Sequence, residues 1–124
     1  MIGEGASFVV INWVVNPFRG DKFAEAWAPA AEAATKYGAR AWAFTRSKDD
    51  PLQFMQIAVF DDKISFERYW YSEEIAEHRV RCSGFYQVPL LPIWYRAVGF
   101  GVAAETIEQP FEENGSGELP VEAG

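Results

Sequence analysis

The sequence contains one cysteine, Cys82, and one histidine, His78, among 124 residues. A lone cysteine cannot form a disulfide within the chain. Chains without disulfides are typical of reducing compartments, so we expect a cytoplasmic protein. The same count excludes every zinc site that is built from several cysteines. Any chemistry that needs an imidazole therefore depends on His78.

Long hydrophobic runs and basic clusters are also missing. No apolar stretch approaches the roughly 18 residues that a membrane-spanning helix needs. The first residues, Met1 to Gly5, lack the basic and apolar regions of a secretory signal. Eleven basic residues stand against eighteen acidic ones, which gives a net charge of −7. Because no basic stripe is available to neutralise phosphates, we expect neither nucleic acid nor membrane as a partner.

The acidic excess lies at the C-terminal end. Residues 1–104 carry twelve acidic and eleven basic side chains, whereas residues 105–124 carry six acidic side chains and no basic one. The terminal stretch has few large apolar residues, and such a composition does not fold on its own. We expect one folded domain over residues 1–104. The acidic tail, 105–124, is expected to contact a neighbouring subunit or another protein.

Alternating apolar residues predict four strands. These cover 7–15, 40–46, 52–60 and 93–102, and a polar turn at 47–51 makes the middle two a hairpin. The first strand ends at Asn16-Pro17, because proline cannot donate a hydrogen bond to a sheet.

Two helical regions separate these strands. Apolar residues recur at helical spacing from Phe23 to Tyr37, with Asp21 as the expected N-cap and Gly38 as the stop. A second helical region runs from the cap at Asp61-Asp62 through Trp70 and starts again at Ser72. The order β-α-β-β-α-β is the split βαβ pattern of ferredoxin-like α+β folds.

The first strand is apolar on both faces. One face carries Phe8, Val10, Asn12 and Val14, and the other carries Val9, Ile11, Trp13 and Val15. Two helical regions cover only one face of a four-stranded sheet. We expect the Asn12 face to line a pocket beneath the second helical region, which leaves the Trp13 face uncovered. Monomers rarely expose so large an apolar patch, so the sequence predicts a two-fold homodimer.

Two polar residues on apolar faces are the candidate site residues. An amide buried in a strand without a hydrogen bond costs roughly 1–3 kcal/mol, so Asn12 has to bond either a substrate oxygen or a backbone group. His78 shares a helix face with Ile75 and Cys82. It can ligate iron, act as a general base, or be a structural histidine satisfied by a neighbour.

Aromatic residues precede the histidine. Tyr69, Trp70 and Tyr71 cannot all face the same way, and we expect Tyr69, three residues after Phe66, to line the pocket. Residues Phe23 and Trp27 are expected in the core. Cys82 is interpreted as a small buried apolar side chain.

These features resemble the antibiotic biosynthesis monooxygenase (ABM) superfamily, the dimeric α+β barrel proteins, over roughly residues 7–102. The likeness rests on the order of elements, on the Phe60-Asp61-Asp62-Lys63 step and on the segment from Phe66 to His78. Within the superfamily the segment is similar to haem-degrading monooxygenases. Their signature is a first-strand asparagine, a tryptophan on the second helix and a histidine that ligates haem iron.

The match to that signature is incomplete. Asn12 and His78 fit it, but Tyr69 stands where the tryptophan is expected and Trp70 comes one residue late. One residue corresponds to about 100° around a helix, so Trp70 cannot replace the tryptophan directly.

The resemblance implies a small monooxygenase that acts on an aromatic, electron-rich molecule without a cofactor. His78 would be the base, Asn12 would stabilise the oxyanion and Tyr69 would orient the ring. The residues implied to contact the substrate are Phe8, Phe66, Trp70 and Ile75. One alternative is haem binding or degradation with His78 as axial ligand. Another is a non-catalytic dimeric module that binds a small hydrophobe or a protein partner, with the acidic tail as the docking element.

Overall fold

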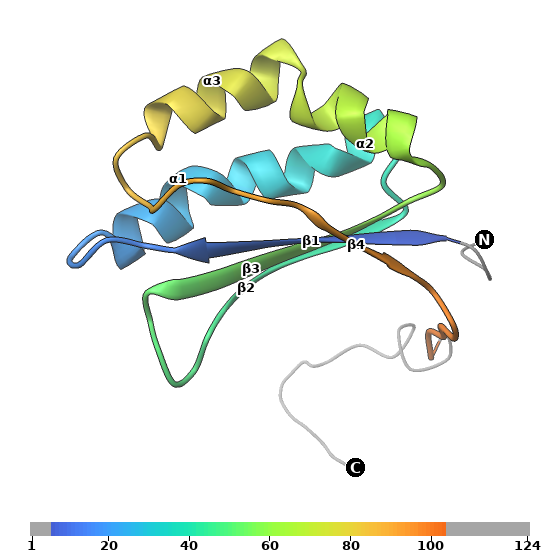
Figure 1. Ribbon diagram of the computed structural model, residues 1–124, viewed down its shortest axis with the longest axis horizontal. Coiled ribbons are helices and arrows are strands. Elements are labelled where there is room, and N and C mark those ends of the chain that lie inside the picture. The colour runs from blue at the N-terminus through green and yellow to red at the C-terminus, as the bar shows by residue number, and fades with distance from the viewer. Residues whose placement is uncertain (1–5, 104–124) are drawn as a thin grey trace, which may run out of the picture.

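A computed structural model describes residues 6–103 of the chain, so the acidic tail lies outside the described residues. The predicted α+β order is confirmed, with the second helical region divided into two helices (Figure 1). The elements are β1 (Ser7–Val14), α1 (Gly20–Glu32), the 3₁₀ helix η1 (Ala33–Tyr37), β2 (Ala41–Arg46), β3 (Gln53–Phe60), α2 (Lys63–Trp70), α3 (Glu73–Arg81) and β4 (Ile93–Arg96).

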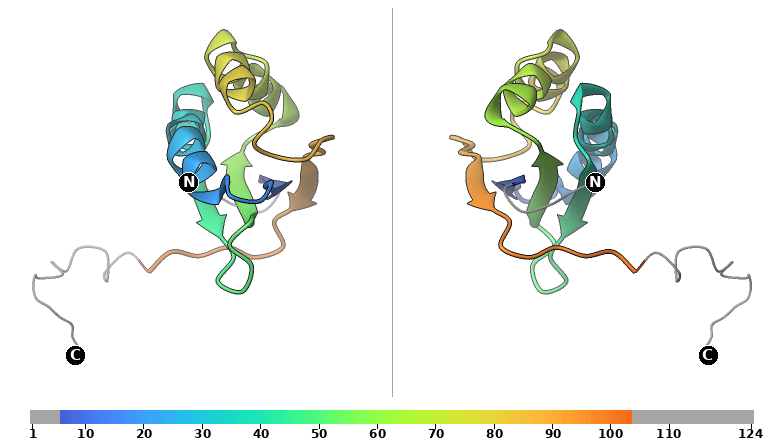
Figure 2. Two further views of the ribbon diagram at one scale, coloured as in Figure 1. Left: turned by 90° about the vertical axis from the view of Figure 1, so that its left-hand side faces the viewer. Right: turned by 90° about the vertical axis from the view of Figure 1, so that its right-hand side faces the viewer.

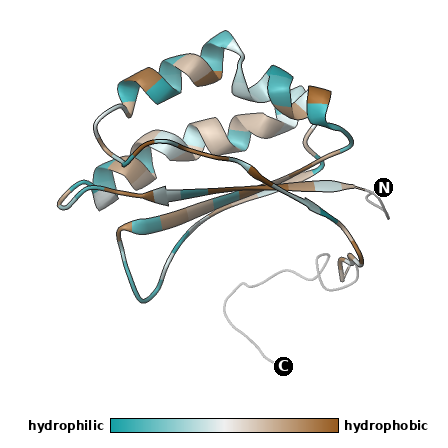
Figure 3. Cartoon of the chain, viewed as in Figure 1, coloured by the Kyte–Doolittle hydropathy of each residue, from teal (hydrophilic) through white to brown (hydrophobic). Residues whose placement is uncertain are grey.

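The strands form one antiparallel sheet in the order β2-β3-β1-β4. All three α-helices lie on one face of it, and the chain that follows β4 passes to the opposite face (Figures 1 and 2). Figure 3 shows hydrophobic residues along the strands and hydrophilic ones at the β2–β3 turn. We call the side without helices the open face. No helix within residues 6–103 is long and apolar enough to cross a membrane.

Strand β1 turns its Trp13 face toward the helices, which is the reverse of the predicted orientation. Residues Val9, Ile11, Trp13 and Val15 are each 1% exposed, whereas Asn12 and Val14 are exposed on the open face. Trp13 pairs with Phe54 on β3, and directly paired residues of neighbouring strands point to the same side. Burying the indole of Trp13 beneath the helices removes more apolar area from water than burying Asn12 would.

The helix side of the sheet holds an aromatic core. The rings of Phe23 and Trp27 on α1 are stacked with centroids 6.2 Å apart, and each lies 5.3 Å from the ring of Trp13. Aromatic pairs of this kind contribute about 0.5–1.5 kcal/mol each beyond area burial. Both α1 residues are fully buried, so their predicted place in the core is confirmed.

Helix α1 starts earlier than predicted. Arg19 occupies the N-cap position, and Asp21 lies in the first turn. The Asp21 carboxylate accepts a hydrogen bond from Arg46 Nη1 at 2.9 Å, so it ties the helix to β2 and does not cap it. At the other end the chain tightens into η1 and stops at Gly38, whose φ of 100° is easily adopted by glycine.

The two predicted helix starts in the second region are confirmed. Asp62 accepts a hydrogen bond from the backbone N–H of Ser65 at 2.9 Å, and Ser72 Oγ accepts from Ile75 N–H at 3.2 Å. Because each cap satisfies a free N–H at a helix start, α2 and α3 form as separate helices.

The last strand is shorter than predicted. The backbone N–H of Ala97 donates to Ala6 O at 3.0 Å, close to the beginning of β1. After this bond, the chain up to residue 103 makes no further strand pairing with the described residues. The ring of Phe100 then lies 5.6 Å from Phe8 on the open face. We call residues 97–103 the strap.

A chain of buried hydrogen bonds joins three elements beneath the helices. Trp27 Nε1–H donates to Gln56 Oε1 at 2.9 Å, and Gln56 Nε2–H donates to the hydroxyl oxygen of Tyr69 at 2.9 Å. The Tyr69 hydroxyl in turn donates to Ala30 O at 2.7 Å, at the point where α1 tightens toward η1. This chain fixes α1 and α2 relative to β3.

We expect Gln56→Leu to lower the free energy of unfolding by about 1–3 kcal/mol, because the Trp27 N–H would be left buried without an acceptor. Urea unfolding measures the loss. Gln87→Leu is the matched control, since Gln87 is exposed and its side chain bonds no residue within 6–103. Equal stability of the two variants would contradict a stabilising role for the chain.

Candidate functional site

The structure divides the predicted site residues between the two faces of the sheet. Asn12 and Phe8 lie on the open face, because they pair with Met55 and Val59 on β3. The others lie on the helix side, namely Phe66, Tyr69, Trp70, Ile75 and His78. The sheet therefore separates Asn12 from Tyr69 and His78, and the expectation that the three share one pocket within a chain is wrong.

The Tyr69 hydroxyl is already fully used in the core. It donates to Ala30 O and accepts from Gln56, and its side chain is 0% exposed. Burial raises the pKa of Tyr69 to about 12, although the hydrogen bond from Gln56 acts in the opposite direction. Tyr69 is therefore a neutral phenol at physiological pH, and its ring is fully buried in the core.

His78 is half-buried on α3, facing α1. Its ring lies 6.3 Å from the Trp27 ring at 74°, in an edge contact. Its Nδ1 is 3.1 Å from Arg81 Nη2. A guanidinium can only donate, so Nδ1 accepts, and the neutral ring carries its proton on Nε2.

The surroundings of His78 favour the neutral imidazole. Burial lowers the pKa of His78, and the positive charge of Arg81 lowers it further. The carboxylates of Glu74 and Glu77 oppose that shift. Glu74 is partly neutralised by Lys36, whose Nζ lies 2.8 Å from Glu74 Oε2. The net effect is that the uncharged imidazole of His78, which can accept a proton, is favoured at neutral pH.

Aromatic rings form the wall next to His78. Trp70 lies 6.1 Å from Trp27 and is stacked on Phe66 at 5.8 Å and 17°. The guanidinium of Arg79 covers the Trp70 ring at 4.8 Å and also donates to Trp70 O. These rings are almost fully buried against one another, so the wall is part of the packed core beside His78.

Two polar groups on the helix side, the indole N–H of Trp13 and the amide of Gln56, were not predicted from the sequence. Trp13 Nε1 is the one buried side-chain N or O atom within residues 6–103 that has no hydrogen-bond partner. Gln56 interrupts a largely apolar strand, as Asn12 does, and that polar residue among apolar ones is the sequence signal by which it could have been predicted. Cys82 is 0% exposed, and burial raises the pKa of its thiol, which agrees with its predicted apolar role.

The residues around His78 decide whether a metal ion or haem can be held. Among residues 6–103, no three His, Cys, Asp or Glu side chains lie close enough together to hold a metal ion. Haem on His78 would need a flat slot beside the imidazole. That side is occupied by Trp27, which contacts both Trp13 and Trp70, so the macrocycle would have to displace it. The residues present do not fit haem.

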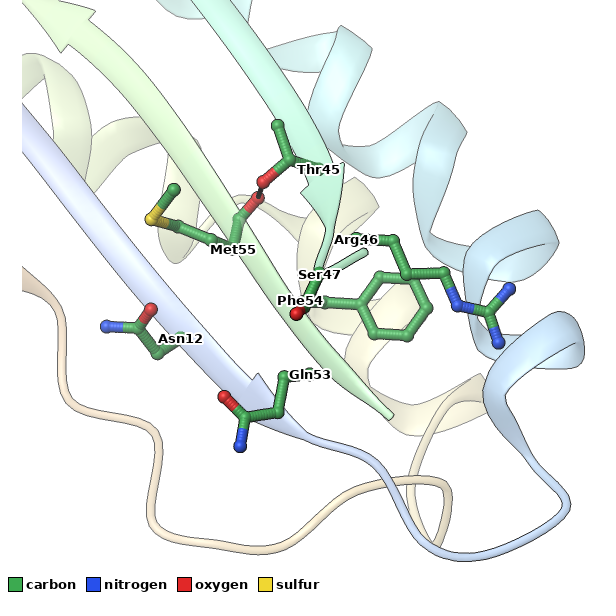
Figure 4. A pocket seen from close by; sticks show the side chains of 7 residues that line it. All are labelled: Asn12, Thr45, Arg46, Ser47, Gln53, Phe54 and Met55. Atoms are coloured by element: carbon green, nitrogen blue, oxygen red, sulfur yellow. Dashed lines mark hydrogen bonds between the residues drawn. The ribbon is translucent and has the colours of Figure 1, made fainter. Parts of the chain in front are cut away.

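The open face has two shallow hollows. One of about 220 Å³ lies over the ends of β1, β2 and β3 (Figure 4) and is lined by Asn12, Thr45, Arg46, Ser47, Gln53, Phe54 and Met55. The other, of about 350 Å³, lies beside the strap and is lined by Phe8, Val10, Ile57, Tyr95, Arg96, Ala97, Val98 and Gly99. In Figure 4 the Asn12 amide stands next to Met55 and Gln53.

The sequence matches no protein-family model and no curated protein sequence. Solved structures do match. A candidate antibiotic biosynthesis monooxygenase from Nitrosomonas europaea superimposes with a TM-score of 0.70 and 14% identity, over 79% of this chain and 95% of that one. The fold is that of the antibiotic biosynthesis monooxygenases. The resemblance predicted from the sequence is therefore confirmed at the level of the fold.

Two other structures of the ABM fold extend the comparison. SnoaB from Streptomyces nogalater, a cofactor-independent oxygenase, gives a TM-score of 0.66 at 16% identity, over 77% of this chain and 96% of that one. A candidate antibiotic biosynthesis monooxygenase from Bordetella bronchiseptica gives 0.66 at 18%, over 77% and 99%. At such identities the likeness shows how the chain folds, and the chemistry has to be argued from its own residues.

We expect the pKa of His78, measured by NMR titration, to lie below 6.5 and to rise in Arg81→Gln, because one positive neighbour is removed. Arg68→Gln, on the exposed side of α2, is the control and should leave the titration unchanged. An unshifted His78 in Arg81→Gln would contradict the contact between the two side chains.

The same shift predicts how stability depends on pH. A histidine whose pKa is lower in the folded state binds fewer protons there than in the unfolded chain. Its contribution is therefore fully favourable above the unfolded pKa of about 6.5 and declines as the pH falls through 6.5 toward the folded pKa.

Proposed function

We propose that this protein is a small monooxygenase that oxidises an aromatic, electron-rich molecule without a metal or an organic cofactor. Its substrate would bind beside His78, and the fully buried Trp27 would have to move away from the imidazole to admit it. The observation that carries the proposal is the neutral imidazole of His78 at the edge of an aromatic wall. The shared fold with SnoaB, a cofactor-independent oxygenase, supports the reaction class by analogy.

The chemistry requires a base and an apolar site. The basic atom is Nδ1 of His78, and the exposed Arg81 side chain has to release it when substrate binds. His78 then removes a phenolic or enolic proton, and the substrate anion gives one electron to dioxygen. The substrate radical and superoxide combine to a peroxide, which takes up the proton from His78 and loses water. A CH₂ group and O₂ thus become C=O and H₂O.

Of the residues predicted for catalysis, His78 keeps its proposed role. Tyr69 would act indirectly by fixing α1 and α2 around the site, since its side chain is fully buried and its hydroxyl is bonded to Ala30 O. Phe66, Trp70 and Ile75 would shape the wall behind the substrate. Asn12 and Phe8 are left out of this site, because they lie across the sheet from His78.

Oxygen uptake with anthrones and hydroquinones tests the proposal. We expect His78→Ala to lower kcat by about 10²–10⁴-fold, the range for loss of a general base. Tyr71→Phe is the matched control, because Tyr71 is an exposed aromatic residue on the neighbouring turn. Unchanged turnover in His78→Ala would exclude the histidine as base. Ligand binding without oxygen uptake by any of these compounds would favour the non-catalytic module.

Haem binding is the alternative that the resemblance implied, and the displaced tryptophan and the filled space beside His78 count against it. Haemin titration in the Soret region, on wild-type protein and on His78→Ala, decides between the two. We expect no saturable one-per-chain complex. A stoichiometric complex that is lost in His78→Ala would overturn that expectation and establish a haem site.

We also propose that the protein is a homodimer formed through the open faces, which are opposite to those predicted from the sequence. The strands have 8, 6, 8 and 4 residues, and at about 3.3 Å along a strand and about 4.8 Å between strands their face measures roughly 400 Å². Two copies would bury about 800 Å² of strand surface, so the strap would have to contribute for the interface to reach the roughly 1,000 Å² at which specific interfaces begin. The lone buried cysteine supports a reducing, cytoplasmic location for this dimer.

Sedimentation equilibrium at micromolar concentration should give twice the mass of the chain. Ile57→Lys, a charge in the middle of the open face, should shift the equilibrium to monomer. Ile64→Lys, on the exposed side of α2, is the control and should leave it dimeric. A monomeric wild-type protein would refute the dimer.

A further inference from the structure

The indole N–H of Trp13 is a buried donor that no described residue uses. Among residues 6–103, its Nε1 is the one buried side-chain N or O atom without a hydrogen-bond partner. The residue is 1% exposed, so bulk water does not satisfy it either. Native structures seldom leave a buried N–H without an acceptor, because the lost hydrogen bonds to water are not replaced. This donor therefore points to an acceptor that enters the core.

A trapped water is a poor acceptor for this N–H. Buried waters make about three hydrogen bonds, so they need several polar partners. The Trp13 ring is instead surrounded by the rings of Phe23, Trp27, Phe44 and Tyr86, at centroid distances of 5.3 to 6.4 Å. An oxygen atom of an aromatic ligand suits this setting better, because the rest of the ligand can pack on the rings.

Trp27 connects the Trp13 donor to His78. Its ring lies 5.3 Å from the ring of Trp13 and 6.3 Å from the ring of His78. The substrate proposed above enters only when Trp27 moves away from the imidazole. An aromatic ring that then takes the place of the Trp27 indole contacts both His78 and Trp13.

These two contacts suit the two changes that proton removal makes in a substrate. When His78 takes the proton, the electron pair that is left spreads onto an oxygen atom of the ring system. In an anthrone the acidic CH₂ group and the carbonyl oxygen lie on opposite sides of the central ring. An N–H that donates to this oxygen binds the oxyanion more strongly than the neutral carbonyl, so it favours the transfer.

We propose that the indole N–H of Trp13 donates to the substrate oxygen and is the oxyanion donor of the site. The inference rests on the proposed function, and it gives Trp13 the role that the resemblance implied for Asn12. The two residues are neighbours on β1 and point to opposite faces of the sheet. Trp13 is the one that lies on the same side as His78.

Anaerobic ligand binding tests the donor without turnover. The probes are anthrone and dihydroanthracene, which has the same three rings and no oxygen. We expect wild type to bind anthrone roughly fivefold more tightly, as one hydrogen bond allows. In NMR spectra the Trp13 indole N–H resonance, assigned by its contacts with neighbouring rings, should move downfield with anthrone only. This readout does not depend on a variant that folds.

Trp13→Phe keeps an aromatic ring and removes the N–H, so the preference for anthrone should disappear. Phe44→Leu is the matched control, because it alters the packing against Trp13 and removes no donor. It should weaken the binding of both ligands and leave the preference intact. A preference that survives in Trp13→Phe, or a Trp13 resonance that anthrone does not move, would overturn the inference.

Oxygen uptake with anthrone separates the inference from the proposed function. Trp13→Phe should lower kcat by about 10²–10³-fold, the range for loss of one oxyanion donor. If His78→Ala loses turnover and Trp13→Phe keeps it, the base stands and the donor is refuted. If wild type takes up no oxygen but its preference for anthrone depends on Trp13, the ligand contact stands and the proposed reaction fails.

Discussion

The packing of Trp13 against α1 determines most of what this protein can do. Once that indole contacts Phe23 and Trp27, the face on which each remaining residue of β1 lies is determined. Because side chains alternate strictly along a strand, Asn12 must then point away from the helices. The position of the largest residue of the strand therefore decides the environment of the most polar one.

The order of elements could be predicted from the sequence because it depends on local signals. The caps at Asp62 and Ser72 and the stop at Gly38 are each visible within a few residues. The face of β1 that the helices cover is not a local property. Both sets of β1 side chains are apolar, and the choice depends on which set fits the rings of α1 and the register with β3.

Gln56 and Asn12 show how similar sequence patterns acquire different roles. Each is an amide in an otherwise largely apolar strand. Gln56 lies beneath the helices, where Trp27 and Tyr69 satisfy it, so it holds the core together. Asn12 lies on the face that no helix covers, and none of the described residues bonds its side chain. In both strands the sequence shows an amide that needs hydrogen-bond partners. Only the fold shows that Gln56 finds its partners within the chain.

The candidate site likewise depends on which polar groups are already bonded within the chain. His78 keeps the protonation state of a base because burial and Arg81 disfavour its charged form, and this depends on α3 lying against Trp27. Tyr69 was expected to orient a substrate, but its hydroxyl bonds the carbonyl that α1 leaves free as it tightens toward η1. Because the Tyr69 hydroxyl donates its one hydrogen to Ala30 O, it has no donor left for a ligand. On this fold the imidazole is therefore the polar group beside the aromatic wall that can both gain and lose a proton near neutral pH.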